Sequence, residues 1–313
     1  MKRFFTILLA IALLLSLAAC RKDPPGPTPP IETTGEIRTE PIQALPAMAD
    51  LLANWAWGTS NGRGEEPAAT HLAVTSYPEG CDFTKLDLAV GPFGQAKVRY
   101  AGEKQGDDSI EPWYFANYDR ITGPYFAFER PVAAVGWDPL ILLDSSVLGE
   151  GLAALRSEYD QNERSYPPAS DQDISKADFL KNGRKVEESQ LLATAGAARV
   201  CMFRYENLEG GGLFTIAYID GDTFLAYDVT TDYVEEDGVY WRVDLEPDNV
   251  GFLQPVLLCN TREGILLLVA WSAPEGMAEL ILREAHGALE GFSLDGYFYD
   301  PWGNEFYLIY EED

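Results

Sequence analysis

Histidine is nearly missing from this 313-residue sequence, which contains only His71 and His286. The two are far apart and form neither an H-x-x-H nor an H-E-x-x-H pattern, so the usual histidine-based metal sites are not indicated. We expect both histidines to have structural roles. No catalytic residue, metal ligand or cofactor site is assigned from the sequence.

Basic residues are also scarce. The sequence has 23 lysines and arginines against 50 aspartates and glutamates, and its formal net charge is −27. Such a chain repels phosphate backbones, so we expect no nucleic-acid partner. The acids are scattered along the chain and do not collect in tails, which favours solubility over a dedicated cation-binding surface as their role.

Long apolar runs are lacking except at the N-terminus. There Lys2 and Arg3 precede the apolar run Phe4–Leu15, and small residues lead into Leu17–Cys20. This layout is typical of a secretory signal peptide, and its apolar core is too short for a stable transmembrane helix. We therefore expect residues 1–19 to be removed. The loss of Lys2 and Arg3 changes the formal net charge from −27 to −29.

The Leu-Ala-Ala-Cys ending of that segment resembles the lipobox of bacterial lipoproteins. The resemblance implies that Cys20 becomes the first mature residue and carries acyl chains such as palmitate, which anchor the protein to a membrane. Arg21 stands where an aspartate would resemble an inner-membrane retention signal, and this implies the outer membrane. Lys22-Asp23 weakly resembles the charged export tag of Bacteroidota surface lipoproteins, so the periplasmic face and the cell surface both stay open.

Cysteine is rare as well. Beyond Cys20 the sequence contains Cys81, Cys201 and Cys259, and this odd number allows at most one internal disulfide. Cys201 and Cys259 both lie in apolar runs that predict strands, so they are the preferred pair in an oxidising, exported environment. The alternative is three free thiols that pack as small hydrophobic groups.

Proline is concentrated just after the anchor. Seven prolines lie between positions 24 and 46, within a segment that is otherwise mostly Thr, Gly, Glu and Ile. Such a composition cannot form a packed core and favours an extended polyproline conformation. We therefore predict that residues 20–46 are a tether between the lipidated cysteine and the body of the protein.

The body is predicted to be mainly β. Residues 47–147 and 197–313 contain short apolar or aromatic runs separated by Gly, Pro and Asp, and Asp220-Gly221 and Asp237-Gly238 are hairpin signals. Helical spacing between these parts, over Leu148–Tyr159 and Ser175–Ala195, predicts a helical segment at about 148–195. In the division of the chain into parts, this segment takes residues 148–196. We expect antiparallel sheets in a sandwich or a barrel, with the two β-rich parts in one domain or two.

Aromatic residues are plentiful by contrast, with seven tryptophans, sixteen tyrosines and fifteen phenylalanines. We expect Trp241 and Trp271 to lie in the core of the sheets. Trp113, which follows Pro112, and Trp302, at a predicted turn, are the candidates for exposed ligand-binding positions, because an exposed indole can stack against a sugar ring.

These observations favour one function and leave two alternatives. We predict a membrane-anchored exported lipoprotein whose β-rich body binds a glycan, a peptide or another envelope protein without catalysing a reaction. One alternative is a surface glycoside hydrolase that uses two carboxylates, although 50 acids do not single out a pair. The other is a structural subunit of a surface assembly such as fimbriae.

Overall fold

The computed structural model describes residues 45–62, 68–107, 109, 118–134, 138–160, 162–208, 211–231, 234–235, 238–241, 246–273 and 276–291. The predicted signal peptide, the predicted lipidation site Cys20 and nearly all of the predicted tether lie outside these residues. Residues 43–313 belong to one compact unit. Its described part is mainly β, with antiparallel sheets and few helices, as predicted.

The first sheet closes on itself as a six-stranded antiparallel barrel. In barrel order its strands are β1 (Trp55–Ser60), β2 (Ala69–Ser76), β5 (Gly123–Val132), β4 (Gly94–Lys104), β3 (Leu88–Gly91) and β6 (Leu140–Leu143). Closure comes from pairing of β6 with both β3 and β1, in which Leu143 lies opposite Trp55. The short helices α2 (Met48–Ala53) and α3 (Ser145–Leu148) flank the barrel in the sequence, and η1 (Phe83–Lys85) precedes β3.

Side chains fill the interior of the barrel. Strand residues alternate between the two faces of a sheet, so Ala56 and Leu142 point inward while Trp57 and Ile141 point outward. The inward set is the barrel core, formed by Ala56, Ala69, Leu72, Val74, Leu86, Ala89, Val98, Phe126, Phe128, Ala134, Leu140 and Leu142. The barrel is therefore a packed body in its own right.

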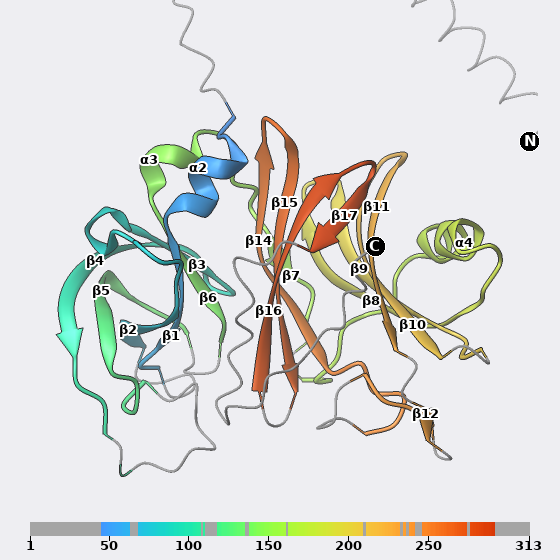
Figure 1. Ribbon diagram of the computed structural model, residues 1–313, viewed down its shortest axis with the longest axis horizontal. Coiled ribbons are helices and arrows are strands. Elements are labelled where there is room, and N and C mark those ends of the chain that lie inside the picture. Colours follow the sequence, from blue (N-terminus) through green and yellow to red (C-terminus); the bar gives the residue numbers. More distant parts are fainter. Residues whose placement is uncertain are drawn as a thin grey trace, which may run out of the picture. The chain divides into compact units, whose positions relative to one another are not determined.

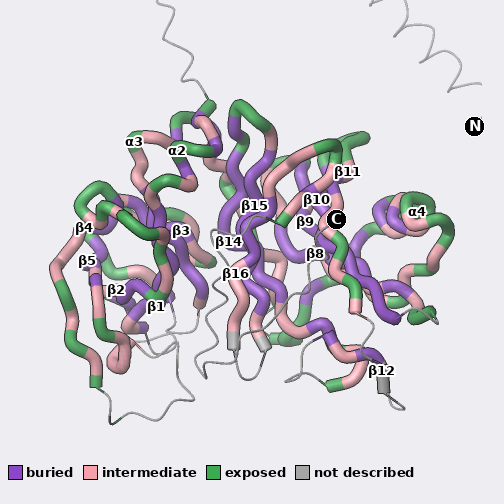
Figure 2. The backbone as a smooth tube through the Cα atoms, in the orientation of Figure 1, coloured by how far each residue is buried: buried purple, intermediate pink, exposed green. Residues whose placement is uncertain are grey.

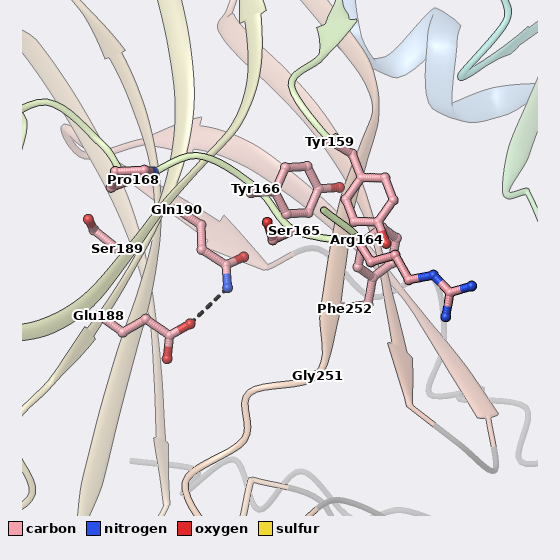
Figure 3. Close-up of a pocket in the computed structure, with 10 residues that line it drawn as sticks. All are labelled: Tyr159, Arg164, Ser165, Tyr166, Pro168, Glu188, Ser189, Gln190, Gly251 and Phe252. Atoms are coloured by element: carbon pink, nitrogen blue, oxygen red, sulfur yellow. Dashed lines mark hydrogen bonds between the residues drawn. The ribbon is translucent and has the colours of Figure 1, made fainter. Parts of the chain in front are cut away.

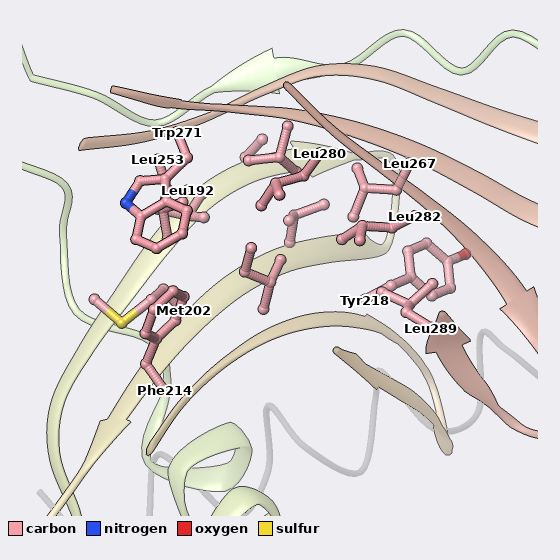
Figure 4. Close-up of a cluster of buried hydrophobic side chains, with 14 of the residues drawn as sticks. Leu192, Met202, Phe214, Tyr218, Leu253, Leu267, Trp271, Leu280, Leu282 and Leu289 are labelled. Carbon is pink, nitrogen blue, oxygen red and sulfur yellow. The ribbon is translucent and has the colours of Figure 1, made fainter. Parts of the chain in front are cut away.

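Two further sheets pack face to face. One has the order β11 (Thr223–Thr231), β10 (Gly212–Asp220), β9 (Ala198–Tyr205), β8 (Val186–Ala195) and β7 (Arg156–Ser157); the other has the order β14 (Phe252–Thr261), β15 (Gly264–Ala273), β16 (Gly276–Ala285) and β17 (Ala288–Gly291). Between them lies the sandwich core, in which Leu192, Met202 and Phe214 of one sheet face Leu267 and Trp271 of the other (Figure 4).

The sheet β14–β17 is covered on both faces. Leu267 points into the sandwich core, whereas its neighbour Leu268 points toward the barrel. We call this second contact the barrel–sheet cluster; it comprises Met48, Leu51, Trp55, Trp57, Leu88, Val90, Ile141, Leu143, Leu148, Val256, Leu257, Cys259, Leu266, Leu268, Ala270 and Ile281. Burial on both sides explains why the sequence of β15 is a nearly continuous apolar run (Figure 2).

The other sheet is covered on its outer face by α4 (Asp171–Leu180). The helix-facing cluster between them contains Ala169, Ala177, Cys201, Phe203, Tyr205, Leu213, Ala217 and Ile219. Ser170 caps the helix, because its hydroxyl accepts a hydrogen bond from the Asp173 backbone N–H. The order of layers along this part of the molecule is thus barrel, four-stranded sheet, five-stranded sheet and helix (Figure 1).

The helical segment predicted over 148–195 contains α4, but its limits differ from the prediction. Helical spacing in Leu148–Tyr159 does not produce a helix, and the predicted helix Ser175–Ala195 is wrong after Leu180 because Val186–Ala195 is strand β8. Leu191 and Leu192 fit the predicted helical spacing, yet they face opposite sides of the strand, Leu192 in the sandwich core and Leu191 against the helix-facing cluster. Adjacent apolar residues arise naturally in such a strand.

Both hairpin predictions are confirmed. Asp220 pairs with Thr223 across a two-residue loop that joins β10 and β11, and Gly221 has a φ of 53° there, a conformation that glycine adopts without strain. Glu235 pairs with Gly238 in the short hairpin of β12 (Val234–Glu235) and β13 (Gly238–Val239).

Among the described residues, no helix combines the length and apolar character needed to cross a membrane.

Candidate functional site

A pocket of about 360 Å³ lies where the β7–α4 connection passes strand β8 and the start of β14 (Figure 3). Its volume is at the lower end of the range of small-molecule sites. Ten residues line it: Tyr159, Arg164, Ser165, Tyr166, Pro168, Glu188, Ser189, Gln190, Gly251 and Phe252. Three segments that are distant in the sequence therefore meet at this site.

One side of the pocket is aromatic. The rings of Tyr166 and Phe252 are stacked with centroids 5.4 Å apart, and Tyr159 meets Phe252 edge-on with centroids 5.0 Å apart and an interplanar angle of 80°. Tyr166 is buried and joins the sandwich core, whereas Tyr159 and Phe252 are partly exposed. Burial raises the pKa of Tyr166 far above its ordinary value, so its hydroxyl stays protonated at neutral pH.

The other side is polar and comes from strand β8. The Gln190 side-chain Nε2 donates a hydrogen bond to Glu188 Oε1 at 2.8 Å. The second carboxylate oxygen of Glu188 accepts one from Arg204 Nε at 3.2 Å, because Glu188 and Arg204 are paired across β8 and β9. The carboxylate is thus oriented by two neighbours, and it shares the Arg204 guanidinium with Glu187, whose carboxylate accepts from Arg204 Nη1 at 2.8 Å.

A tight turn forms the rim. Asp160 and Ser165 pair across it, and the Asp160 carboxylate accepts hydrogen bonds from the backbone N–H groups of Asn162 and Glu163. At its end Arg164 has a φ of 53°, which is unfavourable for a residue with a side chain. The Arg164 side chain extends past Tyr159, away from Glu188 (Figure 3).

A second depression, of about 580 Å³, lies near α3 and the entry of the chain from residue 45. Its described lining residues are Leu45, Pro46, Asp50, Ser145, Ser146, Val147, Gly149 and Arg262, without an aromatic ring among them. Arg262 is already engaged there, since its Nε donates to the Leu45 carbonyl at 2.9 Å. We therefore regard the aromatic pocket as the better candidate for ligand binding.

The predicted site residues have different outcomes. Trp113 and Trp302, the two candidates for ligand binding, and Cys20, the predicted lipidation site, lie outside the described residues. Trp241 and Trp271 are buried in the sandwich core, as predicted, and Trp271 Nε1 donates to the Val250 carbonyl at 2.5 Å.

The disulfide between Cys201 and Cys259 is not formed in the structure, where both are free thiols, as is Cys81. Cys201 belongs to the helix-facing cluster and Cys259 to the barrel–sheet cluster, so the sandwich core lies between them. Burial raises the pKa of each of these two thiols to about 12, which is the behaviour of packed hydrophobic groups.

A short segment of the sequence matches G-x-S-x-G, the pattern of a nucleophile elbow. It runs from Gly58 to Gly62, at the end of barrel strand β1, where Ser60 is fully buried. In a nucleophile elbow the serine of this pattern lies on an exposed turn between a strand and a helix. The described residues do not place Ser60 in that setting, nor do they contain a group of three or more His, Cys, Asp or Glu side chains suited to a metal ion.

Sequence reasoning missed the residues of the pocket. Pro167-Pro168 correctly marks a loop, but nothing in the sequence indicates that Tyr159, Glu188 and Phe252 meet. The prediction of a helix through Glu188 and Gln190 also obscured their position on a strand. Comparisons of this protein with family models, with curated proteins and with solved structures found no match.

Proposed function

We propose that this protein is a membrane-anchored exported lipoprotein whose β-rich body binds a ligand without catalysing a reaction. The aromatic pocket carries the binding part of the proposal, since it combines the partly exposed rings of Tyr159 and Phe252 with the polar pair Glu188 and Gln190. Concave sites with an apolar wall and a few oriented polar groups are the usual form of ligand sites. The anchoring part rests on the sequence that ends in Cys20.

A glycoside hydrolase has less support from this site. Retaining and inverting enzymes both need two carboxyl groups across the scissile bond. Among the described residues that line the pocket, Glu188 is the single carboxylate, and it is held by Arg204 and Gln190. The pocket therefore favours binding over hydrolysis.

The proposal is tested by titrating the full chain, purified in detergent, with panels of oligosaccharides and short peptides and measuring heat by calorimetry. We expect a saturable ligand whose affinity falls about tenfold or more in Phe252→Ala, because a central aromatic contact is lost. Phe179→Ala is the matched control, since Phe179 is 80% exposed on α4 and lies outside the pocket. Equal loss in both variants, or no saturable ligand for a folded protein, contradicts the proposal.

A further inference from the structure

We propose that the ligand of the aromatic pocket is a neutral sugar ring, stacked on Phe252 and hydrogen-bonded to Glu188 and Gln190. This inference rests on the proposed binding function and adds the chemical class of the ligand.

The aromatic wall of the pocket, formed by Tyr159, Tyr166 and Phe252, favours a ligand that has a flat apolar face. One face of Phe252 is covered by the stacked Tyr166, and Tyr159 stands nearly perpendicular to Phe252, so the two partly exposed rings form a corner. Carbon-bound hydrogens carry partial positive charge, and the face of an aromatic ring is negative. A pyranose presents such hydrogens on one face, with its hydroxyl groups around the edge.

The polar wall offers mainly hydrogen-bond acceptors. Each Glu188 oxygen already accepts one hydrogen bond, and a carboxylate oxygen has room for another. Gln190 contributes a carbonyl oxygen, while its Nε2 group is engaged with Glu188. A ligand that meets this wall must therefore supply donors, which hydroxyl groups do.

The charges around the pocket distinguish between anionic, cationic and neutral ligands. An anionic ligand would bring acceptors to this wall in a chain with a formal net charge of −27, and the Arg164 side chain extends away from Glu188. A cationic ligand would supply donors, but its charge would lie close to the guanidinium of Arg204, which contacts Glu188 at 3.2 Å and Glu187 at 2.8 Å. A neutral hydroxyl group needs no counter-charge, so a neutral sugar fits this wall better than a carboxylate, a phosphate or an amine.

The test compares neutral methyl glycosides and oligosaccharides with uncharged and charged peptides, using the full chain in detergent and calorimetry. Phe252→Leu keeps apolar volume and removes the ring face, and we expect about tenfold weaker sugar binding. Gln190→Ala should weaken binding about three- to tenfold, the loss of one hydrogen bond. Phe179→Leu is the control for ring removal elsewhere and should leave the affinity unchanged.

The outcomes separate the two proposals. Sugar binding that responds to Phe252→Leu and Gln190→Ala supports both. A peptide or other non-sugar ligand that responds to Phe252→Leu overturns the sugar assignment and leaves the binding function standing. Absence of any ligand sensitive to Phe252→Leu, with unfolding curves that show folded variants, overturns both.

Discussion

Two carboxyl groups in partly or fully buried positions have pKa values displaced in opposite directions. Burial by itself raises the pKa of Asp173, but hydrogen bonds from Arg199 and Ser170 outweigh it and hold the pKa below its usual value. Arg199 binds this carboxylate in a bidentate manner, because its Nε and Nη2 each donate a hydrogen bond of 2.9 Å to a different oxygen. Glu279 has no such cation among the causes of its shift, and burial raises its pKa to about 8, against a small opposing effect of Ser76.

The position of Glu279 explains this difference. It alternates along β16 with Met277 and Ile281, which pack in the barrel–sheet cluster, so its side chain faces the barrel. Ser76 lies opposite Trp57 at the end of β2, and Trp57 faces the same cluster. Glu279 is therefore a carboxyl group at the contact between barrel and sheet, where its neutral form is favoured.

We predict that Glu279→Gln stabilises the protein at alkaline pH and not at acidic pH. Unfolded Glu279 ionises near pH 4.5 and the folded residue near pH 8, so the native state loses stability as pH rises between these values. Above pH 8 the variant should be more stable by about 2–4 kcal/mol, and near pH 4 the two proteins should be equal. Urea unfolding at a series of pH values measures this difference.

The exposed Glu79 provides a control for the loss of a carboxylate. Glu79→Gln should leave the pH profile of stability unchanged. Parallel profiles for the wild-type protein and Glu279→Gln would show that Glu279 is not a buried, protonated group.

At the scale of elements, strand β15 connects the layers. Its residues Leu267 and Leu268 are 0% and 1% exposed, and they belong to the sandwich core and the barrel–sheet cluster respectively. In an ordinary antiparallel sheet with one wet face, one of two neighbouring residues would be exposed. Here each of the two neighbours packs into a different core, Leu267 into the sandwich core and Leu268 into the barrel–sheet cluster.

We predict that Leu267→Ala and Leu268→Ala each destabilise the protein by about 2–5 kcal/mol, because each removes a fully packed side chain and leaves a cavity. Thr230→Ala on strand β11 is the control; Thr230 is exposed, and its loss should change stability by about 0.5 kcal/mol or less. Midpoints of urea unfolding measure all three. If one of the two leucine variants behaves like Thr230→Ala, that face of β15 is not part of a packed core.

The elements also show where sequence patterns succeed and fail. The hairpin of β10 and β11 follows from Asp220-Gly221, because the turn and its neighbours are local. Strand β8 has no apolar and polar alternation, because a run of four polar residues, 187–190, is followed by Leu191 and Leu192, which pack on opposite faces. Without that alternation the segment does not show the period that identifies a strand. On α4 the apolar pair Phe179 and Leu180 is 80% and 45% exposed, so these two residues do not pack against the sheet although their spacing fits the predicted helix.

At the scale of the whole molecule, the barrel and the sheets share contacts that are independent of the pocket. The barrel–sheet cluster joins them through apolar side chains, and Glu263 in the β14–β15 turn accepts a hydrogen bond from the Met48 backbone N–H at 2.8 Å. Arg262 in the same turn donates its backbone N–H to the Pro46 carbonyl at 2.9 Å. The start of the described chain is therefore tied to the central sheet, just after the predicted tether.

We predict that Cys20→Ser abolishes lipid labelling and releases the protein from the membrane fraction, since no acyl chains can then be attached at residue 20. Metabolic labelling with a fatty-acid analogue and fractionation of cells measure the two effects. Cys81→Ser, which changes a cysteine within the folded body, is the control and should stay labelled and membrane-bound. An unchanged membrane fraction for Cys20→Ser would refute the lipobox interpretation.

The sequence by itself determined the mainly β character, the hairpins and the burial of Trp241 and Trp271, because these depend on local alternation and turn chemistry. The tertiary structure decided the rest, because it depends on contacts between distant residues. Trp55 pairs with Leu143 to close the barrel, and Tyr159, Glu188 and Phe252 come together from three segments to form the pocket. The periodicity of a sequence does not indicate which sheet packs against which. In this protein the packing of the sheets forms the pocket and places Cys201 and Cys259 in different clusters.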